Sequence, residues 1–104
     1  MNILKDKTAI VTGASAGIGR ATAKLFAEEG AKVVAVARRQ QELDTLVQEI
    51  SSVGGIALAH AGDVREESCA KSMVQLAVDE FGGLDIAFNN AGIMGELAPA
   101  NEIS

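Results

Sequence analysis

The chain has 104 residues, 48% of them hydrophobic and 22% charged, which allows one domain of ordinary globular composition. Its net charge of −5 disfavours a nucleic-acid partner, and its one cysteine, Cys69, excludes an intrachain disulfide and suits a reducing compartment. No secretory leader is visible and no apolar run approaches the roughly 18 residues of a membrane-spanning helix, so we expect a cytoplasmic protein with no membrane partner.

Apolar runs and helical periodicities alternate along the chain. Short apolar runs predict strands at residues 7–12, 32–37, 56–61 and 84–88. Apolar residues at i, i+3, i+4 and i+7 predict helices at residues 17–29, 41–53 and 66–81. The resulting order, βαβαβαβ, predicts an α/β fold with a parallel sheet and helices on its faces.

The same spacing predicts which side of each helix is apolar. In the first helix the apolar stripe comprises Ile18, Ala21, Thr22 and Leu25. In the second it comprises Leu43, Leu46, Val47 and Ile50. In the third it comprises Ala70, Met73, Val74, Ala77 and Phe81.

Right-handed crossovers limit how the four strands can be arranged. If the sheet is doubly wound, its strand order is 3-2-1-4, with the first and fourth strands adjacent. Ligands of such sheets bind at the carboxyl ends of the strands, where the strand order reverses. We therefore expect the segments that follow the first and fourth strands to meet at one edge and to border a ligand crevice.

A glycine-rich segment, residues 12–19 (Thr-Gly-Ala-Ser-Ala-Gly-Ile-Gly), lies between the first predicted strand and helix. Glycines let the backbone turn sharply and approach a ligand, and a helix N-terminus offers unpaired N–H groups to an anion. A structural turn without a ligand is the alternative, because turns use glycine freely. The strand and helix on either side favour a phosphate-binding turn, although the glycine spacing, Gly-x3-Gly-x-Gly, differs from the standard dinucleotide fingerprint.

Two further motifs follow later strands: Asp63-Val64 after the third, and Asn89-Asn90-Ala91-Gly92 after the fourth. Together with residues 12–19, and at these spacings, they resemble the N-terminal part of a short-chain dehydrogenase/reductase. The resemblance covers nearly the whole chain. It implies that residues 1–104 form part of an NAD(P)-binding Rossmann domain, a doubly wound sheet truncated to βαβαβαβ.

The resemblance also implies a dinucleotide site at the carboxyl edge of the sheet. It places Gly13, Ser15 and Ile18 along the pyrophosphate and nicotinamide, and residues 90–92 at the floor of the crevice. The expected cofactor-binding residues are Gly13, Ser15, Gly17, Ile18, Gly19, Arg38, Asp63, Val64, Asn90, Ala91 and Gly92.

The adenosine end of this site distinguishes two cofactors. The resemblance places Arg38 beside the adenosine ribose, with Asp63 and Val64 flanking the adenine. NAD-binding relatives carry a carboxylate at the end of the second strand, whereas a nearby arginine accommodates the 2′-phosphate of NADP. Here that strand ends at Ala37 and Arg38, with no acidic residue before Glu42. We therefore expect NADP, with NAD as the weaker alternative.

Hydride transfer between the nicotinamide and a carbonyl or alcohol is the chemistry that the resemblance implies for a longer parent protein. The family uses a Tyr as acid and base with a Lys and a Ser, and these 104 residues contain no tyrosine. We therefore expect no catalytic residues here, and cofactor binding without turnover. No metal site is expected. His60 is expected to have a structural or solvent-facing role, and Cys69 to be an inert residue of the third predicted helix. The alternatives are a non-catalytic nucleotide-binding or assembly module and an inactive fragment.

The predicted fourth strand has a neighbour on one side only. Such an edge presents unpaired N–H and C=O groups to other chains. The crossovers also place two helices on one face of the sheet and one on the other, which leaves apolar surface uncovered. We expect a homo-oligomer formed through this edge or the uncovered face. The alternative is a monomer in which residues 93–104 fold over the gap.

Overall fold

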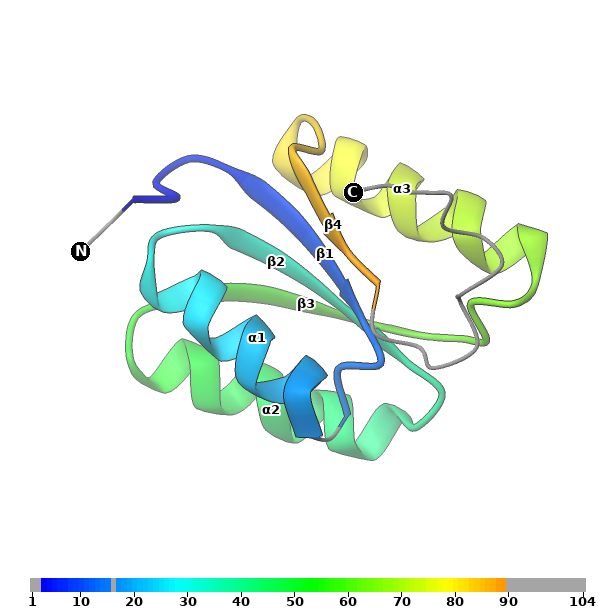
Figure 1. Cartoon of the computed structure of the whole chain (residues 1–104), viewed down its shortest axis with the longest axis horizontal. Coiled ribbons are helices and arrows are strands. Elements are labelled where there is room, and N and C mark those ends of the chain that lie inside the picture. The colour runs from blue at the N-terminus through cyan, green and yellow to red at the C-terminus, as the bar shows by residue number, and fades with distance from the viewer. Residues whose placement is uncertain (1–2, 16, 90–104) are drawn as a thin grey trace.

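A computed structural model describes residues 3–15 and 17–89 of the chain, which form a sheet between two layers of helices (Figure 1). The strands are β1 (Thr8–Thr12), β2 (Lys32–Ala37), β3 (Ile56–Ala61) and β4 (Ile86–Phe88). The helices are α1 (Gly17–Glu28), α2 (Gln40–Ser52) and α3 (Glu67–Phe81). This order confirms the predicted βαβαβαβ pattern.

The sheet has the strand order β3-β2-β1-β4, and every neighbouring pair is parallel. The predicted order 3-2-1-4 and the doubly wound α/β class are therefore confirmed. In the centre, Ile10 of β1 lies opposite Val34 of β2 on one side and Ala87 of β4 on the other. The switch in strand order falls between β1 and β4, and it brings the carboxyl ends of these strands together.

Both faces of the two central strands are covered. All five residues of β1 are buried, and so are all residues of β2 except Lys32. Helices α1 and α2 cover one face and α3 covers the other (Figure 1). Val11 and Val33 pack in the cluster on the side of α1 and α2, whereas Ile10 packs in the cluster beneath α3.

The apolar stripe predicted for α1 is wrong. The buried residues of α1 are Gly19, Ala23 and Ala27. By contrast, Ile18 is 68% exposed and Leu25 is 53% exposed. Small side chains let a helix lie close to a sheet, and the larger apolar residues then fall on the side of α1 that the described residues leave uncovered.

The stripe predicted for α2 is confirmed, since Leu43, Leu46 and Ile50 are buried against the sheet. The prediction for α3 is correct only in part. Ala77 is buried, but Val74 is 40% exposed. The apolar side of α3 also includes Cys69, which the predicted stripe omits.

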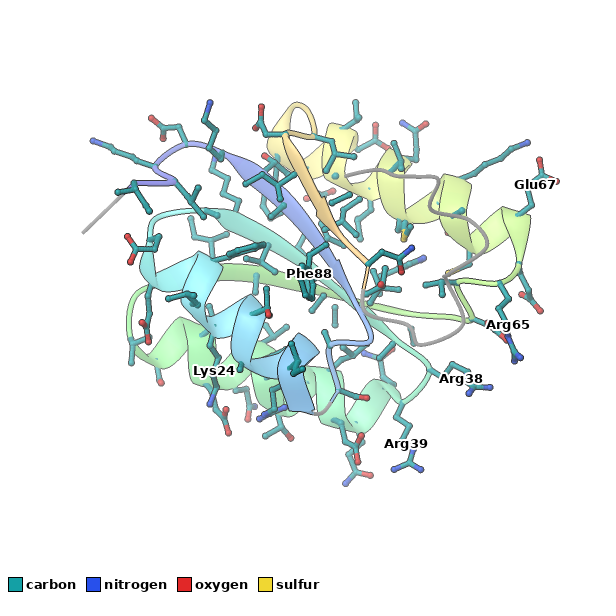
Figure 2. All side chains as sticks on the ribbon, in the orientation of Figure 1. Lys24, Arg38, Arg39, Arg65, Glu67 and Phe88 are labelled. Carbon is teal, nitrogen blue, oxygen red and sulfur yellow. The ribbon has the colours of Figure 1, made fainter. Side chains whose placement is uncertain are left out.

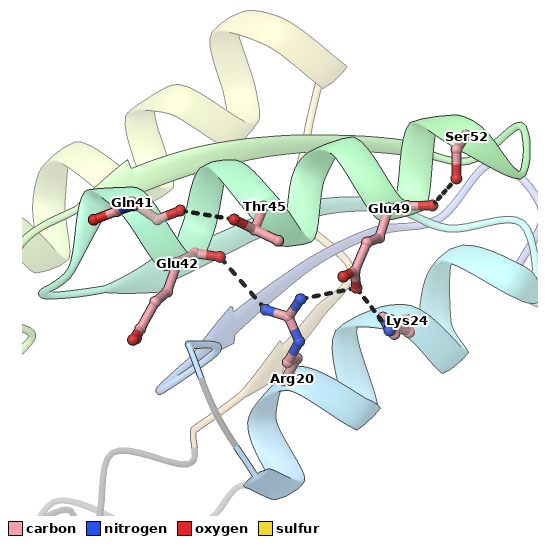
Figure 3. Close-up of polar contacts among 7 residues, drawn as sticks. All are labelled: Arg20, Lys24, Gln41, Glu42, Thr45, Glu49 and Ser52. Carbon is pink, nitrogen blue, oxygen red and sulfur yellow. Dashed lines mark hydrogen bonds and ion pairs between the residues drawn. The ribbon is translucent and has the colours of Figure 1, made fainter.

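Ion pairs join α1 to α2 on the outer side of the molecule. Figure 3 shows Arg20 and Lys24 of α1 converging on the carboxylate of Glu49 in α2, at 2.8 Å and 2.7 Å. Arg20 also donates to the backbone oxygen of Glu42, at 3.4 Å. The hydrogen bond from Lys24 is the main cause that lowers the pKa of Glu49. These contacts hold the two helices side by side.

Candidate functional site

A pocket of about 480 Å³ lies at the carboxyl ends of β1, β2 and β3. This volume is typical of small-molecule sites, which span about 300–1,000 Å³. Three loops form the lining, which consists of Gly13, Ser15, Ala37, Arg38, Arg39, Glu42, Gly62, Asp63, Val64 and Arg65. The pocket therefore lies at the edge of the sheet where the sequence predicts a ligand.

The first loop leads from β1 into α1. Gly13 has φ 63° and Gly17, the first residue of α1, has φ 61°, and side chains other than hydrogen are strained in this region. The N–H of Ala14 donates to the oxygen of Val36 at 3.1 Å, which holds the turn against β2. The first N–H groups of α1 have no carbonyl partner within the helix and suit an anion.

The second loop follows β2 and carries two exposed arginines. Nη1 of Arg39 lies 3.3 Å from Oε2 of Glu42, which neutralises this guanidinium locally. Arg38 has no ion-pair partner among the residues that the structure describes. Figure 2 shows Arg38, Arg39 and Arg65 projecting from the same end of the sheet. The pocket thus has a cationic rim, and Arg38 is the member of it without a paired carboxylate.

The third loop follows β3 and is joined to the second. The N–H of Gly62 donates to the oxygen of Ala37 at 2.9 Å. A Cβ atom at Gly62 would lie 2.8 Å from Sγ of Cys69, so the close approach of this loop to α3 requires glycine. Burial raises the pKa of the Cys69 thiol, which agrees with the expectation of an inert residue.

Asp63 of the third loop is held by Arg65. Oδ1 of Asp63 accepts the backbone N–H of Arg65 at 2.9 Å, and Nη2 of Arg65 lies 2.7 Å from Oδ2. The side-chain hydrogen bonds from Arg65 lower the pKa of Asp63 to about 2, and the charge of Arg38 acts in the same direction. The Asp63 carboxylate is therefore ionised at neutral pH and can accept hydrogen bonds from a ligand.

The end of β4 is fixed to the end of β1. The Thr12 hydroxyl donates to Oδ1 of Asn89 at 2.8 Å and lies 3.4 Å from the oxygen of Phe88. Asn89, the last residue that the structure describes, is therefore held at the carboxyl end of β1. Asn90, Ala91 and Gly92, which the resemblance places at the floor of the crevice, lie outside the described residues.

Several of the predicted site residues come together in the pocket: Gly13, Ser15, Arg38, Asp63 and Val64. Gly17, Ile18 and Gly19 lie in the first turn of α1 and do not line it. The sequence prediction missed Arg65, although its charge and its position two residues after Asp63 were available as a signal.

His60 lies in β3, outside the lining of the pocket. Nε2 of His60 lies 2.8 Å from Oγ of Ser72, so this hydrogen bond joins β3 to α3. Among the described residues, no group of three or more His, Cys, Asp or Glu side chains is arranged to hold a metal ion. Nor does any helix in this part of the chain have the length and apolar character needed to cross a membrane.

The family model of short chain dehydrogenases matches residues 7–104. The chain belongs to the short-chain dehydrogenase family. An uncharacterised oxidoreductase of Listeria monocytogenes is 47% identical over 91 residues, which cover 88% of this chain and 37% of that protein. The cyclohexanol dehydrogenase of Acinetobacter sp. is 41% identical over 103 residues, which cover 99% of this chain and 41% of that protein. The chain spans about two fifths of the length of these curated relatives.

Solved structures of short-chain dehydrogenases share this fold. A metagenomic short-chain oxidoreductase in complex with NADP has a TM-score of 0.78 and 36% identity, over 84% of this chain and 39% of that one. The L-sorbose reductase of Gluconobacter frateurii, complexed with NADPH and L-sorbose, has a TM-score of 0.83 and 38% identity, over 88% of this chain and 36% of that one. The chain is thus a Rossmann-like member of an oxidoreductase family that binds NAD(P).

Proposed function

We propose that these residues form the NADP-binding part of a short-chain dehydrogenase that transfers a hydride between the nicotinamide and a carbonyl or alcohol. The observation that carries the choice of NADP is Arg38, which lines the pocket and has no ion-pair partner within the described residues. NADP differs from NAD by a phosphate on the adenosine ribose. An arginine can bind such a phosphate through several donors at once.

The pocket offers a complementary group for each part of the adenosine half. The turn at Gly13 and the N-terminus of α1 suit the pyrophosphate, because they present a glycine backbone and helix N–H groups. Asp63 can accept a hydrogen bond from the amino group of the adenine, and Val64 can make an apolar contact with the ring. Ser15 also lines the pocket and adds a hydroxyl group that can form a hydrogen bond with the ligand.

The remaining predicted site residues belong to the same proposal. Gly17, Ile18 and Gly19 form the first turn of α1. Residues 90–92 follow β4 in the sequence, and the hydrogen bond between Thr12 and Asn89 joins the end of β4 to the end of β1. We assign the first group to the pyrophosphate and nicotinamide side and the second to the crevice floor. When bound, NADP supplies the site that gives or takes the hydride.

The substrate-side chemistry is proposed for a longer chain that contains these residues. The resemblance assigns proton transfer to a tyrosine, and none is present among the 104 residues. We therefore propose that the chain by itself binds cofactor and does not turn over substrate. We also propose a cytoplasmic location, which the single, buried thiol of Cys69 supports.

Isothermal titration calorimetry of the purified chain with NADP and with NAD tests this function. We expect NADP to bind more tightly by about tenfold, because a hydrogen bond to a charged group contributes about 1.5–3 kcal/mol and the exposed position of Arg38 reduces that value. Tighter binding of NAD would contradict the assignment of Arg38. Failure of both dinucleotides to bind would contradict the proposed function as a whole.

A further inference from the structure

The contact between Asp63 and Arg65 is more elaborate than a surface ion pair requires. Nε of Arg65 lies 3.0 Å from Oδ1 and 3.2 Å from Oδ2 of Asp63, while Nη2 lies 2.7 Å from Oδ2. The backbone N–H of Arg65 donates to Oδ1 at 2.9 Å. Two side-chain nitrogens and one backbone nitrogen of a single residue thus hold one carboxylate.

These bonds limit how many further hydrogen bonds the carboxylate of Asp63 can accept. Each carboxylate oxygen has about two acceptor positions. Oδ1 already accepts two N–H groups, and Oδ2 accepts Nη2 and shares Nε. At most one full acceptor position therefore remains, and it is on Oδ2.

The remaining position is available to a ligand because both residues line the pocket. The side chain of Asp63 is 25% exposed and that of Arg65 is 52% exposed. A fork of two N–H groups on one guanidinium stabilises the charge of a carboxylate and also fixes its rotation. A single ammonium group stabilises the charge without fixing the rotation. Stability alone does not explain the arrangement, since exposed ion pairs contribute little to it.

We propose that Arg65 is a positioning residue that orients Oδ2 of Asp63 toward one N–H donor of the adenine amino group. This inference rests on the proposed function and adds a residue that the sequence motifs leave out. Arg65 acts through Asp63 and itself makes no bond to the amino group. It therefore sets how strongly the site distinguishes adenine from a purine that lacks this group.

The test compares two ligands, NADP and the analogue in which hydrogen replaces the adenine amino group, by isothermal titration at neutral pH. For the wild-type chain we expect NADP to bind roughly tenfold more tightly than the analogue, the value of one hydrogen bond to a charged acceptor. In Arg65→Ala the carboxylate can rotate away, and we expect this ratio to fall below about threefold. Arg65→Lys, which keeps the charge but not the fork, is expected to give an intermediate ratio.

Arg39→Ala is the matched control. It removes the same charge from the same pocket but no contact to Asp63, so the affinity ratio of the two ligands should remain that of the wild type. A wild-type ratio near one, an unchanged ratio in Arg65→Ala, or a wild-type ratio in Arg65→Lys would each overturn the role of Arg65 while leaving NADP binding in place. If the wild-type chain bound neither ligand, the proposed function would fail and this inference with it.

Discussion

The Thr12 hydroxyl donates a 2.8 Å hydrogen bond to Oδ1 of Asn89, which joins the last residue of β1 to the residue after β4. At the opposite end of β4, the N–H of Thr8 donates to Oδ2 of Asp85 at 2.9 Å. Between these contacts β4 has only the residues Ile86–Phe88 in the ladder. Within the described residues, β4 is thus a very short edge strand that is fixed to β1 at both ends by side-chain hydrogen bonds.

Removing the Thr12 hydroxyl should loosen this end of β4. We expect Thr12→Val, which keeps the shape of the buried side chain, to lower the free energy of unfolding in urea by about 1 kcal/mol. Thr45→Val is the matched control, because the Thr45 hydroxyl donates to the backbone oxygen of Gln41 in the same helix, at an exposed position. An equal effect of the two variants would contradict a specific role for the contact between Thr12 and Asn89.

The close packing of α1 on the sheet leads to a second prediction. Ala23 is fully buried, so Ala23→Leu should force α1 away from β1 and lower the free energy of unfolding by about 1–3 kcal/mol. Ala21→Leu adds the same atoms two residues earlier, at an exposed position, and should change stability by less than about 0.5 kcal/mol. Urea denaturation of both variants checks the pair. Greater damage from Ala21→Leu would mean that the predicted stripe, and not the observed one, faces the core.

The helix α1 also shows where the sequence is a poor guide to packing. Strand order and helix placement followed from alternating apolar runs and the handedness of crossovers, which depend on the chain as a whole. Periodicity locates large apolar residues such as Ile18 and Leu25, but it does not report how closely two elements approach. At a close contact the buried positions are small, as at Ala23 and Ala27, and they contribute weakly to any apolar pattern.

The location of the pocket was predictable for the same topological reason, but its internal contacts were not. Motifs place Gly13, Arg38 and Asp63 at the ends of neighbouring strands, and parallel strands bring those ends together. The contact of Asp63 with Arg65 depends on the rotamers of two exposed side chains. No periodicity or motif spacing specifies those rotamers, so the residue that holds Asp63 is recognised only in the structure.

Reversing the charge at Arg38 should reverse the choice of cofactor. Arg38→Asp places a carboxylate directly after β2. It can accept hydrogen bonds from the ribose hydroxyls of NAD, and it repels the 2′-phosphate of NADP. We expect the ratio of NADP to NAD affinity, measured by isothermal titration, to fall from about ten to below one. Arg39→Asp is the control, since Arg39 is already paired with Glu42, and it should retain the preference for NADP. If Arg39→Asp reversed the cofactor preference and Arg38→Asp did not, the 2′-phosphate would contact Arg39, and our assignment to Arg38 would be wrong.

Asp63 should contribute to the acid sensitivity of the fold. Its pKa in the folded chain is about 2, below the ordinary 3.8, so its ionised form favours folding at neutral pH. That contribution is present above the ordinary pKa and is lost as the pH falls from about 3.8 toward about 2. We therefore expect the free energy of unfolding of Asp63→Asn to fall less steeply over this interval than that of the wild type. Titration of the Asp63 carboxyl by NMR checks the cause directly, and a pKa at or above the ordinary value would contradict it.

Self-association is the expected consequence of the exposed edge and apolar surface. Within residues 3–15 and 17–89, β4 pairs only with β1, and Ala87 on it is exposed. The apolar side chains of Ile18 and Leu25 are also more than half exposed. Strand edges with unpaired N–H and C=O groups pair readily with a second copy of the same edge. We expect the average mass of the isolated chain in sedimentation equilibrium to rise with protein concentration.

Two variants distinguish the surfaces that could carry this association. A lysine at the edge opposes strand pairing, so Ala87→Lys should shift the sedimentation profile toward the monomer if the β4 edge is the contact. Leu25→Lys should do so only if the exposed side of α1 is the contact. We expect the larger effect from Ala87→Lys, because edge pairing satisfies backbone groups as well as burying side chains. A cooperatively melting wild-type monomer at every concentration would contradict self-association through either surface.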